Sequence, residues 1–376
     1  MLGSPRLSKA PTAMMRRTVL IGGGALALAG GASYVGLRRM GSMKDYNGFV
    51  AAMRAALAVH PEVADLIRFA TLAPNGHNTQ PWKFHVAGDR IEISPDFARR
   101  TPVVDPDDHH IFVSLGCAAE NLALAAAARG QPGEISFNSA NDGAVVFSFG
   151  AGPTTRSDLF DAIPHRQSTR AVYDGRPVAA AELRTLAAAA VMPGVDLVLI
   201  TDRVQIDRAR DLIIAGNSAQ MGDAAFEREL ISWLRFNPRQ ALATGDGLFT
   251  PTTGNPVLPT WLGPSMVEMT FKASSENDRY ARQVQSSSGM AVFVSESADK
   301  GHWVRAGRAC QRFALQATAL GLKVAFVNQP VEVASLRPEL AALVGLPGRR
   351  PDLVMRFGYG PTLPFSARRP VEAVLA

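Results

Sequence analysis

The sequence predicts an α+β fold rather than a doubly wound α/β fold. Helical patterns outnumber strand patterns, and the strands are spaced irregularly instead of alternating with helices. No glycine-rich loop with dinucleotide spacing follows a predicted strand, so a Rossmann-type site is not expected. A chain of 376 residues, 47% of them hydrophobic, is long enough to form two lobes with a sizeable core.

Helices are predicted where apolar residues recur every three to four positions, and strands where short apolar runs are bounded by turn residues. In the first half these patterns give a helix over 63–73, a hairpin of strands 83–86 and 90–93, a helix over 111–129 and a strand over 145–149. In the second half they give helices over 179–190, 204–217 and 303–320 and strands over 197–201, 290–295, 323–327 and 353–357.

Positive charge is concentrated at the start of the chain. Residues 1–44 carry seven of the 39 lysines and arginines and none of the 33 acidic residues, which leaves 32 basic against 33 acidic residues elsewhere. The rest of the chain is therefore nearly neutral, and we expect no nucleic-acid partner.

The first 44 residues have the pattern of a targeting leader. Arg16 and Arg17 directly precede an apolar, glycine- and alanine-rich run that continues to Ala32, as in a twin-arginine (Tat) signal. Residues 27–29, Ala-Leu-Ala, offer a small-x-small cleavage site. We expect export through the Tat translocon to the periplasm or cell envelope. The alternative is an uncleaved leader that acts as an amino-terminal anchor.

Residues 73–82, Ala-Pro-Asn-Gly-His-Asn-Thr-Gln-Pro-Trp, end the first predicted helix. Pro74, Asn75 and Gly76 stop the helix, and Asn78 then offers an amide where the backbone has turned outward. Such a turn can wrap a flat polar ligand. The alternative is an ordinary loop whose amides satisfy local backbone groups.

A second segment, residues 164–170, combines two arginines with other polar side chains. Arg166 and Arg170 flank the amide of Gln167 and the hydroxyl of Ser168. This combination suits a phosphate bound by charge-assisted hydrogen bonds.

A third segment lies near the end of the chain. Residues 357–360, Phe-Gly-Tyr-Gly, lead to Pro364 and then to Arg368, Arg369 and Pro370.

Together the three segments resemble signatures of the nitroreductase family. The first resembles its Ala-Pro-Ser-x-x-Asn-x-Gln-Pro-Trp turn, the second its Arg-x-Ser-x-Arg or Lys element, and the third its closing Gly-Tyr segment with a basic residue before the last proline. In an ordinary member the arginine element comes first and a homodimer completes each site. Here the turn precedes it by almost a hundred residues, which is similar to the Acg-like, exported branch of the superfamily. This order implies a fused, duplicated unit in which one chain imitates the dimer.

An internal comparison supports the duplication. Residues 115–124 align with residues 306–315 and share a glycine, two small positions, a Glu/Gln and a closing leucine. The predicted domains are the leader 1–44, a first nitroreductase-like lobe 45–152 and a second lobe 153–376 with a long insertion at 236–264.

The resemblance implies that the chain binds FMN and that the flavin carries the chemistry, so no catalytic side chain is expected. The phosphate, the ribityl chain and the pyrimidine edge of the ring are assigned to Arg166, Gln167, Ser168 and Arg170, with Arg368 adding a second charge at the phosphate. The ring is expected to pack against Pro74, Asn75, Gly76 and Asn78, and near its N5 we expect Asn328 and Gln329.

Two functional hypotheses follow. The first is an FMN-dependent oxidoreductase acting on nitro-aromatic, quinone or similar planar acceptors. The second is a protein that sequesters FMN without turnover. The usual Pro-x-Glu-Gly after strand 323–327 is missing, and an exported protein lies away from cytoplasmic nicotinamides. These two observations argue against a nicotinamide donor, whereas the family resemblance implies one. The expected electron donor is NAD(P)H or another reductant.

The insertion 236–264 is rich in proline and glycine but keeps several large apolar residues. A loop of this length is usually functional or disordered. We predict a lid over the flavin, with Phe249 or Trp261 placed where a planar substrate would stack. A dimer arm is the alternative.

Cysteine and histidine positions give no metal site. Cys117 and Cys310 fall on predicted helices and are expected to be buried, unpaired thiols, although a bridge between them is the alternative. His109 and His110 follow an acidic stretch, but adjacent histidines on a helix point in different directions. We interpret them as a solvated helix start.

Overall fold

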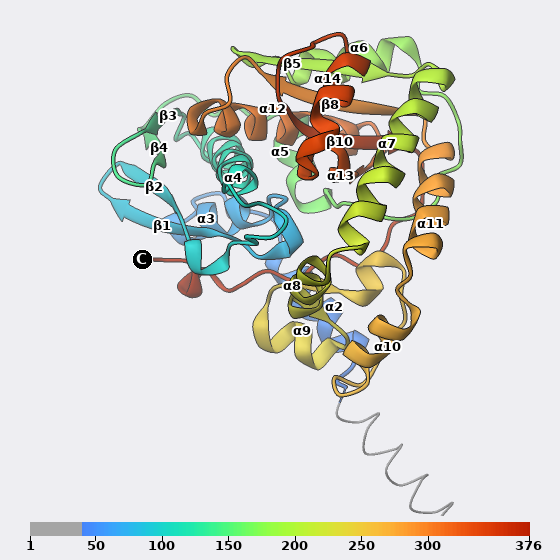
Figure 1. The fold of residues 1–376 in the computed structure, drawn as a ribbon. Helices are drawn as coiled ribbons and strands as arrows, with labels where there is room; N and C mark the ends of the chain where they lie inside the picture. Colours follow the sequence, from blue (N-terminus) through green and yellow to red (C-terminus); the bar gives the residue numbers. More distant parts are fainter. Residues whose placement is uncertain (1–39) are drawn as a thin grey trace, which may run out of the picture.

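The computed structural model describes residues 40–376, so the predicted Tat signal lies outside the described residues (Figure 1). Its α-helices are α2 (Met43–Met53), α3 (Val63–Thr71), α4 (His109–Ala127), α5 (Asp158–Ala162), α6 (Ala180–Ala189), α7 (Arg203–Met221), α8 (Ala224–Trp233), α9 (Pro238–Thr244), α10 (Gly263–Thr270), α11 (Ala273–Gln285), α12 (Lys300–Ala319), α13 (Gln329–Glu332) and α14 (Arg337–Leu343). Its strands are β1 (Trp82–Ala87), β2 (Arg90–Pro95), β3 (Gly133–Asn138), β4 (Ala144–Phe149), β5 (Val195–Ile200), β6 (Leu234–Arg235), β7 (Leu248–Phe249), β8 (Gly289–Ser295), β9 (Lys323–Phe326) and β10 (Pro351–Gly358).

Two four-stranded sheets organise the chain. The first has the strand order β1-β2-β4-β3 and the second β5-β8-β10-β9. Every strand pair within these two sheets is antiparallel. Since a doubly wound fold requires a mostly parallel sheet, the predicted α+β class is confirmed.

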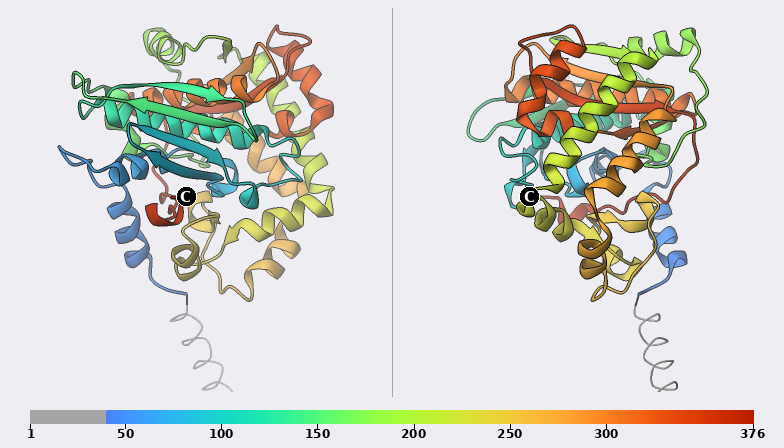
Figure 2. Two further views of the ribbon diagram at one scale, coloured as in Figure 1. Left: turned by 90° about the vertical axis from the view of Figure 1, so that its left-hand side faces the viewer. Right: turned by 45° about the vertical axis from the view of Figure 1, so that its right-hand side comes forward.

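Helices α4 and α12 connect the two sheets through a shared core (Figures 1 and 2). Helix α4 packs on the first sheet, α12 packs on the second, and the two helices pack against each other. One apolar cluster therefore runs from Phe147 of β4 through Leu115 and Phe313 to Phe293 of β8. Helix α4 is apolar and long enough to cross a membrane by composition, but its burial is that of a core helix.

The two sheets differ in how many faces they bury. Strands β8 and β10 are buried along their whole lengths, because α12 covers one face while α7, α13 and α14 pack on the other. Strand β1 instead begins with alternating buried and exposed positions and ends exposed. Strands that are buried on both faces are mostly apolar along their length. In a sheet with one exposed face, buried and exposed side chains alternate along each strand.

The first described helix and the carboxyl-terminal segment pack against distant parts of the sequence. Helix α2 packs against α9, and the ring of Tyr46 lies 4.3 Å from the ring of Phe249. At the other end, the amide of Phe84 donates to the carbonyl of Val374 at 2.8 Å. The boundary predicted near residue 152 separates the two sheets along the sequence, while α2 contacts α9 beyond it and the carboxyl-terminal segment returns to β1.

The predicted helices and strands are found, with ends shifted by a few residues. The sequence did not predict the helices α2, α5, α8, α9, α10, α11, α13 and α14 or the strands β3, β6 and β7. Strand β3 lies at a sheet edge and is mostly exposed, and α11 is dominated by polar residues. Only Ile135 and Phe137 are large apolar residues in β3, and α11 has few apolar residues, so neither segment gives a strong apolar pattern.

Both cysteines are buried and free, as expected. The thiol of Cys117 donates to the carbonyl of Gly307 at 3.1 Å, within the α4–α12 contact.

Candidate functional site

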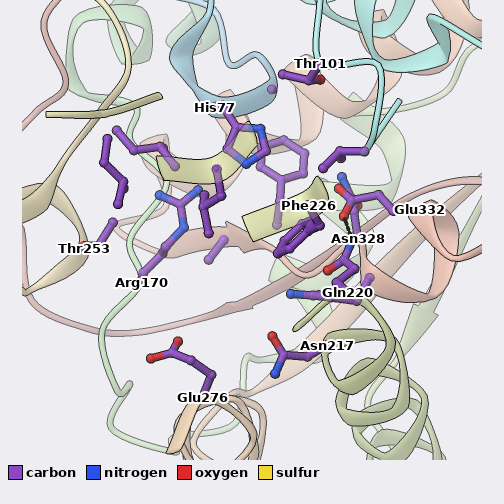
Figure 3. Close-up of a pocket in the computed structure, with 18 of the residues that line it drawn as sticks. His77, Thr101, Arg170, Asn217, Gln220, Phe226, Thr253, Glu276, Asn328 and Glu332 are labelled. Atoms are coloured by element: carbon purple, nitrogen blue, oxygen red, sulfur yellow. Dashed lines mark hydrogen bonds between the residues drawn. The ribbon is translucent and has the colours of Figure 1, made fainter. Parts of the chain in front are cut away.

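A cavity of about 550 Å³ is lined by residues from both halves of the chain (Figure 3). Its wall comes from the turn after α3, the start of α4, helices α7, α8 and α11, the turn after β9, and the segment from β6 to α10. This volume is typical of small-molecule and cofactor sites. Six of the sequence-predicted site residues line it: Pro74, Asn75, Gly76, Arg170, Asn328 and Gln329. The other five lie outside the lining: Asn78, Arg166, Gln167, Ser168 and Arg368.

The turn after α3 places its first residues at the cavity and uses the later ones to hold the structure together. Asn75 accepts a hydrogen bond from the amide of Gln80 at 2.8 Å through its Oδ1 atom, which closes the turn. Three residues, His77, Asn78 and Gln80, have positive φ. The Nδ2 group of Asn78 donates to the carbonyl of Gly247 at 3.0 Å. Asn78 therefore anchors the segment after α9 and does not line the cavity.

Arg368 and Arg166 lie at the carboxyl end of α3 instead of the cavity. Arg368 donates to the carbonyl of Thr71 at 2.6 Å, and both arginines donate to Leu72, at 3.3 and 2.9 Å. The last carbonyls of a helix lack internal partners and carry partial negative charge, so buried guanidinium groups stabilise them.

These contacts leave both arginines in a cationic cluster. Burial lowers the pKa of Arg166 to about 10, and burial together with the charge of Arg166 lowers the pKa of Arg368 to about 9. Arg54, directly after α2, lies near both arginines and donates to the carbonyl of Pro164 at 2.8 Å. Arg166 and Arg368 are two of the residues expected to bind the phosphate. Because both donate hydrogen bonds to backbone carbonyls, the structure does not bring them to the cavity.

Gln167 and Ser168 hold neighbouring segments. Gln167 donates to the carbonyl of Leu363 and accepts from the amide of the same residue, both at 2.9 Å. Ser168 forms an isolated parallel bridge with Val324 of β9. Both residues thus fix the path of the chain just before Arg170, rather than lining the cavity as expected.

Arg170 is the member of the predicted arginine element that reaches the cavity (Figure 3). Among the described residues its guanidinium has no hydrogen bond or ion pair, and burial lowers its pKa. Arg279 of α11 lies in the same wall, where Glu276 is 3.6 Å away and the carbonyl of Thr253 accepts from it. Two arginines and one carboxylate leave a net positive charge at this end of the cavity.

The turn after β9 forms another part of the wall. Asn328 accepts from the amide of Val354 at 2.8 Å, which fixes the turn against β10. The Oε1 atom of Gln329 is buried and has no hydrogen-bond partner. Gly216 of α7 allows this close approach, since a Cβ atom there would lie 2.7 Å from the Cβ atom of Gln329.

Three polar side chains that the sequence did not assign also line the cavity. His77 comes from the turn after α3, His110 from the start of α4 and Glu332 from α13. Burial lowers the pKa of His77 to about 4, so its imidazole is neutral at neutral pH. The adjacent His109 and His110 were a signal for this site, but they were interpreted as a solvated helix start. That interpretation was wrong, because His109 is fully buried and His110 faces the cavity.

Ligand atoms of Asp105, His109 and His110 lie within 4.8 Å of one another. Each of these side chains already has a protein partner. Asp105 accepts from the backbone amide of His110 at 2.9 Å, His109 contacts Asp352 at 2.9 Å, and His110 contacts Glu332 at 3.6 Å. We therefore interpret the group as side chains that connect α4, β10 and α13 rather than as a metal site.

The insertion 236–264 is ordered and contributes to the cavity, but not through the two aromatic residues expected. Phe249 is 1% exposed and packs on Tyr46, and Trp261 is 77% exposed. Neither lines the cavity. The lining residues of the insertion are Phe236, Leu248, Thr250, Thr253, Asn255, Pro256 and Leu258.

No family model matches the chain. The protein named "Putative NAD(P)H nitroreductase Rv3131" of Mycobacterium tuberculosis is 27% identical over 342 residues, covering 85% of this chain and 94% of the relative. The protein named "Putative NAD(P)H nitroreductase acg" of the same organism is 22% identical over 329 residues, covering 83% and 94%. A solved FMN-bound nitroreductase of Desulfitobacterium hafniense is 16% identical with a TM-score of 0.37, covering 59% of this chain and 98% of that chain. Over most of its length, this chain is thus similar to proteins named as nitroreductases, which supports the superfamily that its motifs resemble.

Proposed function

We propose that the chain is an FMN-dependent oxidoreductase of the nitroreductase type, which transfers two electrons to nitro-aromatic, quinone or similar planar acceptors. The observation that carries the proposal is the guanidinium of Arg170. It has no protein partner among the described residues and lies in the wall of a cavity that both halves of the chain line. A charged side chain that is partly removed from water and has no opposite charge nearby raises the free energy of the protein. A bound anion would neutralise the charge and remove this cost.

The residues present fit FMN. The phosphate would be held by Arg170 with Arg279, because a dianion balances the net positive charge at that end of the cavity. The isoalloxazine edge carries hydrogen-bond donors, and the unpartnered Oε1 atom of Gln329 is an available acceptor. Gly76 leaves open space at the wall, since nothing lies within 4 Å of the position of a Cβ atom. When bound, FMN would accept and release the electrons.

Pro74, Asn75 and Asn328 also line the cavity and complete the proposed flavin site. The relatives that share most of this chain are named as NAD(P)H nitroreductases, and a nicotinamide is accordingly the first electron donor to test. Another reductant is the alternative if the chain works outside the cytoplasm.

The first test is the visible absorption spectrum of the purified chain. We expect a yellow protein whose released flavin is FMN and whose spectrum bleaches with NADH, NADPH or dithionite. Addition of a quinone should then restore the oxidised spectrum faster than oxygen alone. A colourless protein that cannot be loaded with FMN would contradict the proposal.

The second candidate function is FMN sequestration without turnover. It is favoured by the apolar residues that the insertion brings to the cavity, including Phe236, Leu248 and Leu258. Sequestration predicts that bound FMN is reduced by dithionite but not by NADH or NADPH, and that added acceptors do not accelerate reoxidation.

We further propose export by the Tat pathway, based on Arg16 and Arg17 ahead of the apolar run. Replacement of both arginines by lysine should retain the full-length chain in the cytoplasm. The size of the mature chain in the periplasm or envelope fraction distinguishes a cleaved leader from an anchor.

A further inference from the structure

The side of the cavity away from Arg170 contains a hydrogen-bonded group that the proposed FMN contacts do not use. The Nε2 atom of His110 lies 3.6 Å from Oε1 of Glu332. Gln220 of α7 donates to Oε2 of the same carboxylate at 2.6 Å. All three residues line the cavity, and Glu332 and Gln220 lie across it from Arg170 (Figure 3).

The position of His110 is fixed by Asp105 and Glu332. Its backbone amide donates to both carboxylate oxygens of Asp105, at 3.0 and 2.9 Å, at the start of α4. Glu332 is held from the opposite side by Gln220, so its other oxygen is directed to the imidazole. The side chain of His110 is 12% exposed and is therefore reachable from the cavity.

The surrounding charges favour the protonated form of His110. Burial opposes that form, but the nearby carboxylate of Glu332 and the charge of Asp105 outweigh it and raise the pKa of His110, against the opposing charge of Arg350. His110, the hydrogen bond from Gln220 and the charge of His77 lower the pKa of Glu332 despite its burial. His77 also lines the cavity, but its pKa is lowered to about 4. It is therefore neutral near neutral pH and does not compete with His110 as a proton donor.

We propose that the His110–Glu332 pair donates the proton to the acceptor in this cavity, and that it selects acceptors whose reduction places negative charge on an oxygen. The inference rests on the proposed flavin function and deepens it. The substrate class it favours is planar quinones and nitro-aromatic compounds rather than acceptors without such an oxygen.

The proton and electron balance closes for a quinone. A quinone that has taken up a hydride equivalent is a hydroquinone monoanion, and bound FMN would supply that hydride equivalent. The N–H bond of the His110 imidazolium then breaks and an O–H bond forms on that oxygen, which gives hydroquinone and neutral imidazole. Water reprotonates the imidazole, and Glu332 stabilises the resulting charge.

The test uses 4-nitrobenzoate, a planar aromatic carboxylate that stays anionic through the neutral range. Its binding to the purified full-length chain is measured by calorimetry as a function of pH. We expect binding to weaken as the pH rises through the pKa of His110. His110→Gln should weaken it by roughly tenfold to a hundredfold, as expected for loss of a charge-assisted hydrogen bond. His60→Gln, on an exposed loop, is the matched control and should bind normally.

Glu332→Gln keeps the side-chain shape but removes the charge that sustains the imidazolium. It should move the pH midpoint of probe binding downward, which a purely structural role would not do. This variant also decides the outcome if His110→Gln fails to fold. An unchanged midpoint in Glu332→Gln, or normal binding to folded His110→Gln, would overturn the proposal.

Two further readouts separate the possible failures. Loss of probe binding in Arg170→Ala but not in His110→Gln would place the carboxylate at the cationic end and overturn the proposal. The flavin absorbance of every preparation is recorded in parallel. A chain that never binds FMN refutes the proposed function, whereas a flavin-containing chain without His110-dependent probe binding refutes this inference alone.

Discussion

Gly116 of α4 and Gly307 of α12 make the same contact in opposite directions. A Cβ atom at Gly116 would lie 2.0 Å from the carbonyl oxygen of Val304, and one at Gly307 would lie 2.0 Å from that of Val113. Each valine precedes the glycine of its own helix by three residues, so the contact has local two-fold character. The two glycines are the pair matched by the internal sequence comparison. Their reciprocal contact supports duplication of an ancestral unit.

This contact predicts that Gly307→Ala destabilises the chain strongly. A methyl group cannot occupy 2.0 Å from a backbone oxygen, so α4 and α12 must separate across the shared core. We expect a loss of about 3–5 kcal/mol in the free energy of unfolding, measured by denaturant titration. Gly48→Ala is the control, because Gly48 lies on an exposed part of α2 with nothing within 4 Å. It should be neutral or stabilising by up to ~1 kcal/mol. Equal effects of the two changes would refute the packing argument.

Replacement of Arg170, which lines the cavity, and of Arg368, which binds backbone carbonyls at the end of α3, should have different effects on flavin binding and stability. Arg170→Ala should lose FMN during gel filtration while keeping the thermal midpoint of the flavin-free chain, because its side chain has no protein partner among the described residues. Arg368→Ala should lower that midpoint, because buried carbonyls at the end of α3 lose their donor, at a cost of roughly 1–3 kcal/mol or more. Arg184→Ala, on the exposed face of α6, should change neither property. Normal flavin retention by Arg170→Ala would show that the phosphate binds elsewhere.

Stability should fall between pH 6.5 and about 4 through His77. Its pKa is lowered from 6.5 to about 4 by burial, despite the charge of Glu332, while Arg170 and His110 also oppose its protonation. The unfolded chain therefore binds more protons in this window, so the stabilising contribution is complete above the unfolded pKa and is lost as the pH falls to the folded one. The effect should reach roughly 1–3 kcal/mol after allowance for exposure to the cavity.

His77→Asn tests this pH dependence, because asparagine tolerates the positive φ of 48° at this position. Urea unfolding of the flavin-free chain at several pH values should give a flatter acid limb for the variant. His60→Asn should keep the slope of the unchanged chain. An unaltered slope in His77→Asn would show that other groups control acid unfolding.

The flavin stoichiometry should be close to one FMN per chain. The cavity joins the turn containing Pro74 to the loop at Arg170, and the sequence contains no second copy of either segment. Released flavin measured against protein concentration provides the check. A ratio near two would imply a second site related to the first by the Gly116–Gly307 symmetry.

Some features of this protein follow from short stretches of sequence. The hairpin of β1 and β2 forms because two short apolar runs flank a Gly-Asp turn, and the α4–α12 pair was visible as two similar helices with matched glycines. The turn at Pro74–Gly76 was also predicted, since proline and glycine end a helix by local geometry. Local sterics and periodicity determine such elements, so tertiary context is not needed to find them.

Tertiary structure alone decided which polar residues meet at the cavity. Arg166 and Arg170 have the same chemistry in the sequence, but the end of α3 lies next to the first and the cavity next to the second. The contact of His110 with Glu332 joins residues far apart in the chain, so no spacing rule could reveal it. A charged side chain takes its role from the partner that folding brings to it. For Arg166 that partner is a helix carbonyl, and for Arg170 it is the cavity.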